Sequence, residues 1–351
     1  MGGLALPRWG GSYLELPDFP QADRLGRASK GTLEIKARPN PDSQTVGVLY
    51  EDGVLPWLRE VAGEQPAYIF YNQKWVETPE GYVYGPYFQP VRNLPNQPVE
   101  KLPTVSLGTG MWVEVTVPYV DVILETEPTS NSWVEVKTEE GLPIRFYYSQ
   151  VFWVDQTKKS QSGALLYRVN PNYYGGVDRL WADGRAFRPI SHAELAPISP
   201  EVENKRIRVD VAHQTLSCFE DEVEVYFCRV STGAKFDKDG NVVDSWSTPI
   251  GTHRVSRKFI SLQMSGGTTG AGYDIPGIGW VSIFATGGVA IHSTFWHNNF
   301  GDPMSHGCVN ALPEDAKWIF RWTLPKVDYD PGMYDISLTG EASTQVGVVE
   351  G

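Results

Sequence analysis

The sequence has 351 residues, 41% of them hydrophobic, which is enough for two or three domains with apolar cores. Its formal net charge of −12 leaves no basic surplus to neutralise phosphates, which argues against nucleic acid as the main partner. The 35 glycines, 26 prolines, 12 tryptophans and 17 tyrosines favour many short strands and turns.

Residues 1–26 form an N-terminal segment that opens with a short apolar run, Gly2 to Trp9. The run is too short for a signal peptide and has no positively charged start. It is interpreted either as the remnant of a signal segment from a longer precursor or as an ordinary apolar start. The sequence contains no 18-residue apolar run, so it predicts no membrane span.

Residues 27–97 contain short alternating stretches separated by turn residues, a pattern typical of a small β-barrel. Pro95, Pro98 and Pro103 then mark a linker. The expected strands lie within residues 33–38, 46–49, 54–57, 75–78 and 81–84.

Residues 98–200 are predicted to form a second β-rich module. Its expected strands are Trp112–Val117, Ser132–Val136 and Leu165–Val169. The run from Ala196 to Pro200 is interpreted as the boundary to the next domain, because its prolines interrupt regular structure.

Residues 201–351 are expected to be strand-dominated. A helix is predicted to begin at Pro313, because proline suits the first turn and Glu314 and Asp315 suit the positive N-terminal end. Residues 345–349 are predicted to form a closing strand.

Cys218 and Cys228 lie on a predicted hairpin in this region. A two-residue turn at Asp221-Glu222 places Cys218 opposite Val225 and Cys228 opposite Thr215, with the two thiols on opposite faces. We therefore favour two buried free cysteines over a disulfide, although a longer turn changes this register.

The most informative feature is a thiol close in sequence to two imidazoles, in Ile291–Thr294 and Ser305–Asn310. His292 and Cys308 are too far apart to be neighbours on one helix or strand. They meet only if the chain folds back, with residues 295–304 as a loop between two adjoining strands. The loop has suitable turn residues, Asn298, Asn299, Gly301, Asp302 and Pro303.

This pairing predicts nucleophilic catalysis by a thiol. A thiolate is the nucleophile, so a catalytic cysteine needs a nearby base. Gly307 lets the backbone approach a substrate closely, and backbone N–H groups beside Cys308 are suited to stabilise a developing oxyanion. The competing interpretation is a buried structural cysteine with histidines that satisfy core hydrogen bonds.

The pattern of histidine, loop and Ser-His-Gly-Cys-Val-Asn resembles the signature of the L,D-transpeptidase catalytic domain. Upstream segments extend the resemblance over residues 201–351: Ile207–Asp210, Gln214–Leu216, Val230–Gly233, the Thr-Pro-x-Gly turn in Thr248–Val255, and Tyr273, Pro276-Gly277 and Trp280. The chain departs from the more frequent pattern in having Ser293 after the histidine and a short loop.

The resemblance implies a mainly β fold. Residues 201–351 would form a β-sandwich or barrel catalytic domain with one or two short helices. Residues 27–97 resemble a bacterial SH3-like β-barrel domain, and the Trp/Tyr-x-x-Val pattern of residues 98–200 is similar to a further SH3-like module.

The resemblance also implies roles for individual residues. Cys308 is the expected nucleophile and His292 its general base. The backbone carbonyl of Ser293 would orient His292, in a Cys-His-carbonyl version of a catalytic triad. Main-chain N–H groups of His306, Gly307 and Cys308 would form the oxyanion hole.

Four residues are assigned to the substrate-binding surroundings, two of them as braces. Tyr273 and Trp280 belong to the aromatic-rich flap, and the phenol of Tyr273 is a candidate further oxyanion donor. Ser305 and Asn310 are expected to brace the loop rather than react. His297 is expected to be a solvated loop residue or a substrate contact.

The implied substrate is a stem tetrapeptide of peptidoglycan, cross-linked through a thioacyl-enzyme with release of D-alanine. No cofactor is expected, and the substrate implies an exported protein of the periplasm or cell wall. The SH3-like modules are candidates for binding wall polymer. The acceptor stays open between an amine, water, which gives L,D-carboxypeptidation, and a protein lysine.

Two alternatives compete with this function. His292, His297, His306 and Cys308 could supply zinc ligands, but their spacing matches no common zinc motif, and no metal is expected. A non-catalytic cell-wall-binding protein is the second alternative, and the intact set of His292, Ser293 and Cys308 argues against it.

Overall fold

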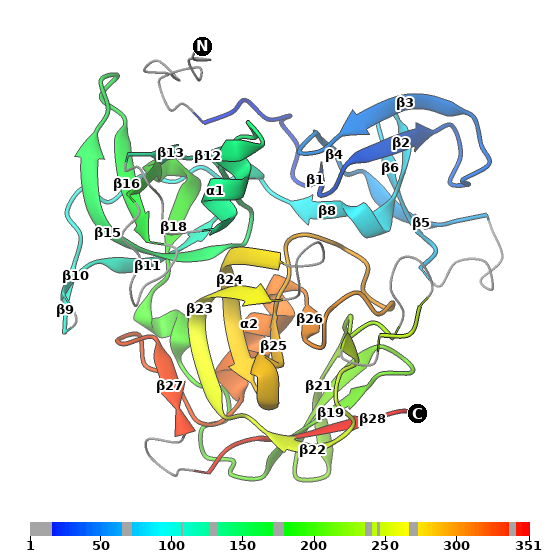
Figure 1. The fold of residues 1–351 in the computed structure, drawn as a ribbon, viewed down its shortest axis with the longest axis vertical. Helices are drawn as coiled ribbons and strands as arrows, with labels where there is room; N and C mark the ends of the chain where they lie inside the picture. The colour runs from blue at the N-terminus through cyan, green and yellow to red at the C-terminus, as the bar shows by residue number, and fades with distance from the viewer. Residues whose placement is uncertain are drawn as a thin grey trace, which may run out of the picture.

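The computed structural model describes residues 16–64, 72–106, 108–125, 132–170, 179–235, 241–243, 246–266, 273–336 and 342–351. The run from Gly2 to Trp9 lies outside these residues, as do the interpretations attached to it. Three groups of strands follow one another along the chain, and Figure 1 shows the first two side by side above the third. The described residues are mainly β with two α-helices, which confirms the predicted fold class.

The first group has two sheets, with strand orders β4-β1-β8 and β3-β2-β7-β6-β5. In β2, Leu33 and Ile35 are buried and Thr32 and Glu34 are exposed, the period-two pattern of a strand with one face on the core. All five expected strands are present, and the SH3-like assignment stays a prediction. The strands are β1 (Leu25–Ala28), β2 (Thr32–Lys36), β3 (Thr45–Tyr50), β4 (Val54–Pro56), β5 (Arg59–Ala62), β6 (Lys74–Thr78), β7 (Gly81–Tyr84) and β8 (Phe88–Val91), with the 3-10 turn η1 (Gly85–Tyr87).

The second group is built on a six-stranded sheet of order β13-β17-β16-β15-β11-β18, with the pairs β12-β14 and β10-β9 beside it. Its elements are β9 (Thr104–Val105), β10 (Gly108–Thr109), β11 (Met111–Val115), β12 (Tyr119–Asp121), β13 (Ile123–Leu124), α1 (Ser132–Glu139), β14 (Arg145–Tyr147), β15 (Val151–Lys159), β16 (Leu165–Asn170), β17 (Leu180–Asp183), β18 (Phe187–Pro189), η2 (Gly184–Ala186) and η3 (His192–Leu195).

The strand predicted at Ser132–Val136 is wrong, because these residues begin helix α1. Trp133 and Val134 are adjacent and both buried, whereas 49% of Val136 is exposed. A strand would point adjacent side chains to opposite faces, whereas in a helix they lie on neighbouring parts of one side. The helix is therefore the way to bury both.

A sequence repeat links the first two groups. Residues 85–90 and 184–189 both read Gly-x-x-Phe-x-Pro, and each forms a 3-10 turn followed by a short strand. The phenylalanines, Phe88 and Phe187, are both fully buried. The repeat supports the expectation that the two modules are structurally similar.

The third group contains two five-stranded sheets, β21-β20-β19-β28-β22 and β26-β25-β24-β23-β27. The predicted closing strand is β28, which lies between β19 and β22 rather than at an edge. The strands are β19 (Lys205–Asp210), β20 (Thr215–Glu220), β21 (Val223–Arg229), β22 (Gly251–Arg254), β23 (Arg257–Gly266), β24 (Tyr273–Ile283), β25 (Ala290–Ser293), β26 (Val309–Ala311), β27 (Met333–Asp335) and β28 (Gln345–Val349), with the 3-10 turn η5 (Thr286–Gly288).

Cys218 and Cys228 are both free and buried, as predicted. The predicted register is wrong, however, because a bulge follows Cys218 in β20. Cys218 lies opposite Tyr226, and Cys228 lies opposite Leu216. Both thiols therefore face the same core, which a one-residue shift of register explains.

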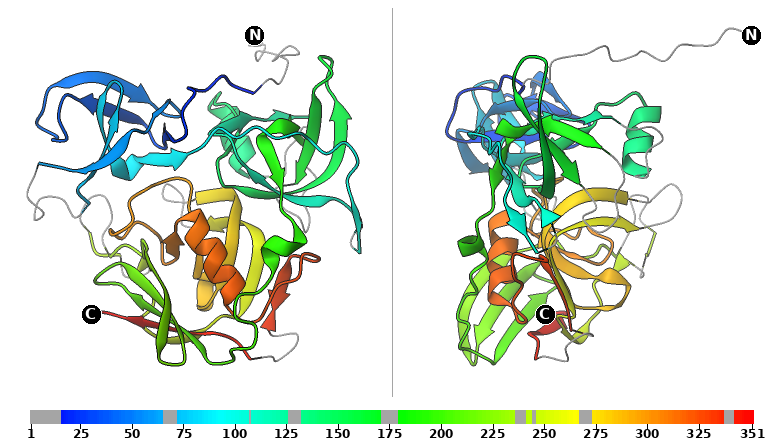
Figure 2. Two further views of the ribbon diagram at one scale, coloured as in Figure 1. Left: turned by 180° about the vertical axis from the view of Figure 1, so that it is seen from behind. Right: turned by 90° about the vertical axis from the view of Figure 1, so that its left-hand side faces the viewer.

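The predicted helix is α2 (Pro313–Trp322), which packs on β24 and β25, as Figure 2 shows from behind. Lys258 ends this helix from inside the core: its Nζ donates to the carbonyl oxygens of Phe320, Thr323 and Pro325 at 2.6, 2.8 and 2.8 Å. The ammonium thus satisfies carbonyl groups that a helix C-terminus leaves unpaired. Neither α-helix among the described residues is long and apolar enough to cross a membrane.

Replacement of Lys258 by methionine should destabilise the protein strongly. The side chain is fully buried, and the change removes the ammonium donor from three carbonyl oxygens, at a cost on the order of 3 kcal/mol. The Phe320 carbonyl retains a donor, the Thr323 hydroxyl at 3.2 Å. Thermal unfolding of the two proteins measures this loss. Lys326→Met is the matched control, because Lys326 is exposed, and an unchanged midpoint for Lys258→Met would contradict the capping role.

Candidate active site

The segment with His292 and Cys308 folds back on itself, as predicted. β25 and β26 pair in parallel, with Ile291 opposite Val309 and His292 opposite Asn310. Cys308 directly precedes β26, and the same register places it beside Ala290. Because alternate residues of a strand share a face, His292 and Cys308 project from the same face of this pair.

His292 is held as a neutral imidazole. Its Nδ1 lies 2.9 Å from the carbonyl oxygen of Ser293, and because a carbonyl only accepts, Nδ1 carries the proton and Nε2 is left as an acceptor. Burial lowers the pKa of His292 to about 4, against the opposing effect of the Ser293 hydrogen bond. The ring is therefore a base with one defined accepting nitrogen.

Cys308 is half-buried, and its Sγ lies 4.0 Å from the carbonyl oxygen of Gly288. Burial raises the pKa of this thiol to about 11, partly offset by a hydrogen bond from the backbone of Ala290. Desolvation penalises the charged form of both the acid and the base. The site therefore holds a neutral thiol and a neutral imidazole, not a preformed thiolate.

The turn before Cys308 is fixed by hydroxyl groups. Ser305 Oγ donates to the carbonyl of Cys308 at 2.5 Å and accepts from the N–H of Gly307 at 3.1 Å. Thr248, in the Thr-Pro-x-Gly turn, donates to the carbonyl of Gly307 at 2.8 Å. The φ of Gly307 is +119°, which favours glycine. Ser305 thus braces the turn, as expected, and its place among the substrate-binding residues stays a prediction.

His297 is buried, so the expectation of a solvated loop residue is wrong. Its Nδ1 accepts from the N–H of Asn299 at 3.1 Å, and its Nε2 lies 2.9 Å from the side-chain amide of Asn310. Burial lowers the pKa of His297 to about 3. A neutral imidazole has one N–H, so Nε2 donates. The nearest atom of Asn310 is its Nδ2, and two donors cannot bond to each other, so the amide must be turned over to present its oxygen, which has no other partner among the described atoms.

Asn310 therefore also serves as a brace rather than a substrate contact. Its backbone N–H and carbonyl group bond to Ser231 at 2.8 and 2.9 Å, and it is almost fully buried. It joins the loop, through His297, to the strand that follows Cys308.

Three aromatic rings gather at the open side of the site. The His306 ring is exposed and lies 4.3 Å from the Trp246 ring and 5.4 Å from the Tyr273 ring, between centroids. Burial, and the nearby Cys308, raise the pKa of Tyr273. Tyr273 is thus placed near the thiol as expected, whereas no sequence pattern indicates that Trp246 lies there.

The expectation that Trp280 contacts substrate is wrong. Only 1% of this side chain is exposed, and its ring packs 5.6 Å from that of Phe320 on helix α2. The Nζ of Lys317, on the same helix, lies 4.9 Å from the centre of the indole ring. Trp280 therefore belongs to the core between β24 and the helix.

The candidate zinc ligands do not come together. His297 is bonded to Asn299 and Asn310, and the His306 ring is exposed beside Trp246. In the part of the chain that the structure describes, no group of three or more His, Cys, Asp or Glu residues is arranged to hold a metal ion.

The region that contains this site matches a known protein family. Residues 204–332 match the YkuD family, the L,D-transpeptidase catalytic domain. The match contains His292, Ser293 and Cys308, and it confirms the predicted resemblance for this part of the chain. Among curated proteins, none matches the sequence.

Solved structures similar to the chain include three L,D-transpeptidases. That of Enterococcus faecium is 22% identical, with 43% of this chain and 51% of that chain covered and a TM-score of 0.31. That of Stackebrandtia nassauensis is 20% identical, with 45% and 60% covered and a TM-score of 0.28. That of Mycobacterium smegmatis is 15% identical, with 55% and 98% covered and a TM-score of 0.32. The chain thus spans little more than half the length of the first two.

The raised pKa of Cys308 makes a prediction for alkylation. Iodoacetamide reacts with the thiolate, so its rate constant with Cys308 should keep rising above pH 9.0, towards about 11. An ordinary thiol would level off near pH ~8.5. Mass spectrometry of the Cys308 peptide measures the rate, and Cys308→Ala gives the background from the other two cysteines. A plateau near the ordinary value would contradict the raised pKa of Cys308.

Proposed function

We propose that this chain is an L,D-transpeptidase of peptidoglycan stem peptides with Cys308 as nucleophile. The observation that carries the proposal is the His292–Ser293 hydrogen bond on the strand beside Cys308. It leaves His292 Nε2 as a proton acceptor on the face from which the thiol projects. The family match of residues 204–332 supports the same chemistry.

In the acylation step, Cys308 Sγ attacks the amide carbonyl of the diamino-acid residue that precedes the terminal D-alanine. The thiol proton passes to His292 Nε2, and the imidazolium so formed is stabilised by its Nδ1–H bond to the Ser293 carbonyl. The tetrahedral intermediate then collapses, the C–N bond breaks, and His292 returns the proton to the leaving D-alanine amine. A thioester on Cys308 remains.

In the second step, His292 accepts a proton from an acceptor amine as that amine attacks the thioester. A new amide forms between two stem peptides, and the thiol is regenerated. With water as the acceptor, the same steps give L,D-carboxypeptidation and no cross-link.

Burial determines at which stage the thiol proton passes from Cys308 to His292. Because the pKa of His292 is lowered and that of Cys308 is raised, an ion pair is unfavourable before substrate arrives. Proton transfer is therefore coupled to formation of the S–C bond. Such a site resists alkylation and oxidation at rest, since these need the thiolate.

The proposed oxyanion donors are the backbone N–H groups of His306, Gly307 and Cys308. The N–H of Gly307 donates to Ser305 Oγ in this structure. This N–H can donate to the oxyanion only if its bond to Ser305 Oγ breaks. Ser305 would still donate to the Cys308 carbonyl. The phenol of Tyr273 is a further proposed donor.

The N-terminal modules and the location belong to the same proposal. Peptidoglycan lies outside the cytoplasmic membrane, so we propose that the protein is exported. Binding of wall polymer is the role proposed for the SH3-like modules, residues 27–97 and 98–200.

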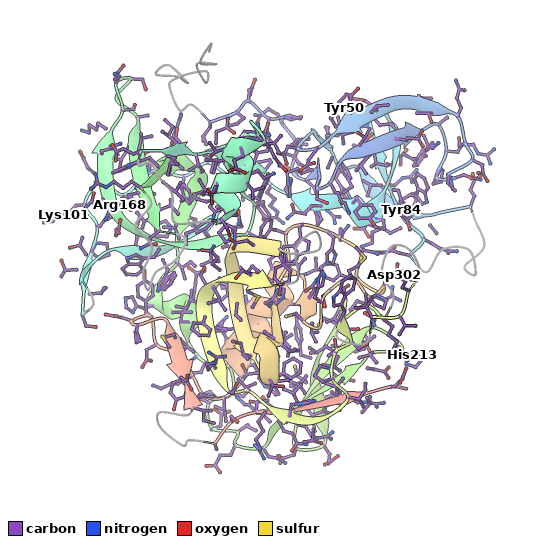
Figure 3. All side chains as sticks on the ribbon, viewed as in Figure 1. Tyr50, Tyr84, Lys101, Arg168, His213 and Asp302 are labelled. Carbon is purple, nitrogen blue, oxygen red and sulfur yellow. The ribbon has the colours of Figure 1, made fainter. Side chains whose placement is uncertain are left out.

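The test is turnover of a defined tetrapeptide muropeptide by three variants of the whole chain. Cys308→Ala should abolish product. His292→Ala should lower the rate about 10³-fold, because the general base is lost. His213→Ala is the matched control and should behave as wild type, since His213 is exposed and lies in the turn between β19 and β20 of the other sheet, where Figure 3 labels it.

Product analysis by mass spectrometry separates the alternatives. Cross-linked dimers with free D-alanine support transpeptidation, whereas trimmed tripeptides alone show that water is the acceptor. Full activity in folded Cys308→Ala would refute the thiol mechanism, and no turnover by the wild type would favour the non-catalytic wall-binding alternative.

A further inference from the structure

The first half of the loop between His292 and Cys308 is held by the N-terminal modules. We propose that Arg27, Asp52, Asn72 and Tyr147, with the backbone of residues 85–88, form a clasp that positions this loop for the reaction. The inference rests on the proposed function, and it makes both modules part of the support of the active site.

Arg27, on β1, is the centre of the clasp. It is almost fully buried, and its guanidinium bonds to Asp52 Oδ1 at 2.6 Å and to Gln89 Oε1 at 2.7 and 3.2 Å. Its remaining recorded bond, at 3.1 Å, is to the backbone carbonyl of Phe295 in the loop. Displacement of the loop would remove an acceptor from a buried charge, which is unfavourable.

The second module contributes through Arg145 and Tyr147 on β14. Arg145 donates to the other oxygen of Asp52 at 2.7 Å, so this carboxylate joins the two modules. The Tyr147 ring lies under the Arg27 guanidinium, 4.2 Å from its centre, and stacks on the Phe295 ring at 5.8 Å. Phe295 is thus fixed by a hydrogen bond and by an aromatic contact.

Two asparagines extend the clasp along the loop. The backbone N–H of Asn298 donates to the Pro86 carbonyl at 2.7 Å, and its side-chain amide lies 3.2 and 3.3 Å from two further carbonyls of residues 85–88. The side chain of Asn299 accepts from Asn72 at 3.0 Å. Backbone carbonyls of one module thus bind the loop of another.

The second half of the loop is held by its own domain instead. Gly301 and Met304 donate from their backbone to Val230 and Thr232 at 2.9 Å. The loop is therefore fixed at both ends by different parts of the chain, and its first half depends on the clasp.

A short chain of contacts connects the clasp to the reacting groups. The Asn299 N–H bonds to His297, and His297 bonds to Asn310. Asn310 pairs with His292 across the β25–β26 ladder and is two residues from Cys308. Movement at residues 295–299 therefore changes how the thiol and the imidazole lie relative to each other.

The test uses the full chain with Arg27→Met, Arg27→Lys and Asn72→Ala. The control is Arg168→Met, which removes a half-buried ion pair with Asp155 in the second module, on the opposite side from Asp302 of the loop (Figure 3). Each variant is measured for tetrapeptide kcat and KM, for the pH profile of Cys308 alkylation, and for hydrogen exchange of residues 295–299.

We expect Arg27→Met to lower kcat about 10²-fold with little change in KM, because misplaced reacting groups cost rate rather than binding. The pH at the midpoint of the Cys308 alkylation profile should fall towards about 8.5, because water then reaches the thiol. Asn72→Ala should cause a smaller loss in the same direction. Arg27→Lys should keep part of the kcat that Arg27→Met loses. Arg168→Met, the control, should show none of these changes. A variant that merely contains less folded protein would lose activity, but the thiol of its folded fraction would ionise as in wild type. A lower kcat together with a lower alkylation midpoint therefore indicates the clasp.

Folded Arg27→Met with wild-type kcat and wild-type protection of residues 295–299 would overturn the clasp. If Arg27→Met does not fold, unchanged kcat and alkylation in Asn72→Ala overturn it. If the wild type does not turn over tetrapeptide, the proposed function fails, while the alkylation profile and hydrogen exchange still decide whether the clasp positions Cys308.

Discussion

The parallel pairing of β25 with β26 is the constraint on which the site depends. A parallel connection cannot be a tight turn and needs a dozen or more residues, usually with a helix that packs back on the sheet. Here the crossover is a loop without a helix. Its backbone must find partners elsewhere, and it does so in its own domain for one half and in the N-terminal modules for the other. Because the two strands pair in parallel, the loop between them depends on distant parts of the chain for its hydrogen-bond partners.

The same packing sets the chemistry of the thiol. The Trp296 ring of the loop lies 5.8 Å from the His292 ring, and burial disfavours the charged forms of both His292 and Cys308, so both groups are neutral. The Ser293 carbonyl then selects which nitrogen of His292 can accept a proton. In the proposed mechanism, reactivity therefore comes from geometry that a bound substrate would complete, rather than from a stored thiolate.

Local features of the site were predictable from the sequence, and long-range ones were not. The return of the chain between His292 and Cys308 and the helix at Pro313 follow from turn residues and end signals near each other in sequence. The clasp joins Arg27 to Phe295, 268 positions apart, and no local pattern predicts such a contact. Trp280 was misplaced because an aromatic residue near glycines does not show which face of β24 it occupies. The Gly-x-x-Phe-x-Pro repeat of the first two modules, by contrast, is visible in the sequence and was missed.

Trapping the covalent intermediate tests the central claim most directly. The whole chain is mixed with a tetrapeptide muropeptide, quenched in acid during the first turnover, digested, and mapped by mass spectrometry. The account predicts an increase on the Cys308 peptide equal to the donor minus D-alanine, removed by hydroxylamine as expected for a thioester. Release of D-alanine with an unmodified Cys308 peptide, or with the acyl group on another residue, would contradict it.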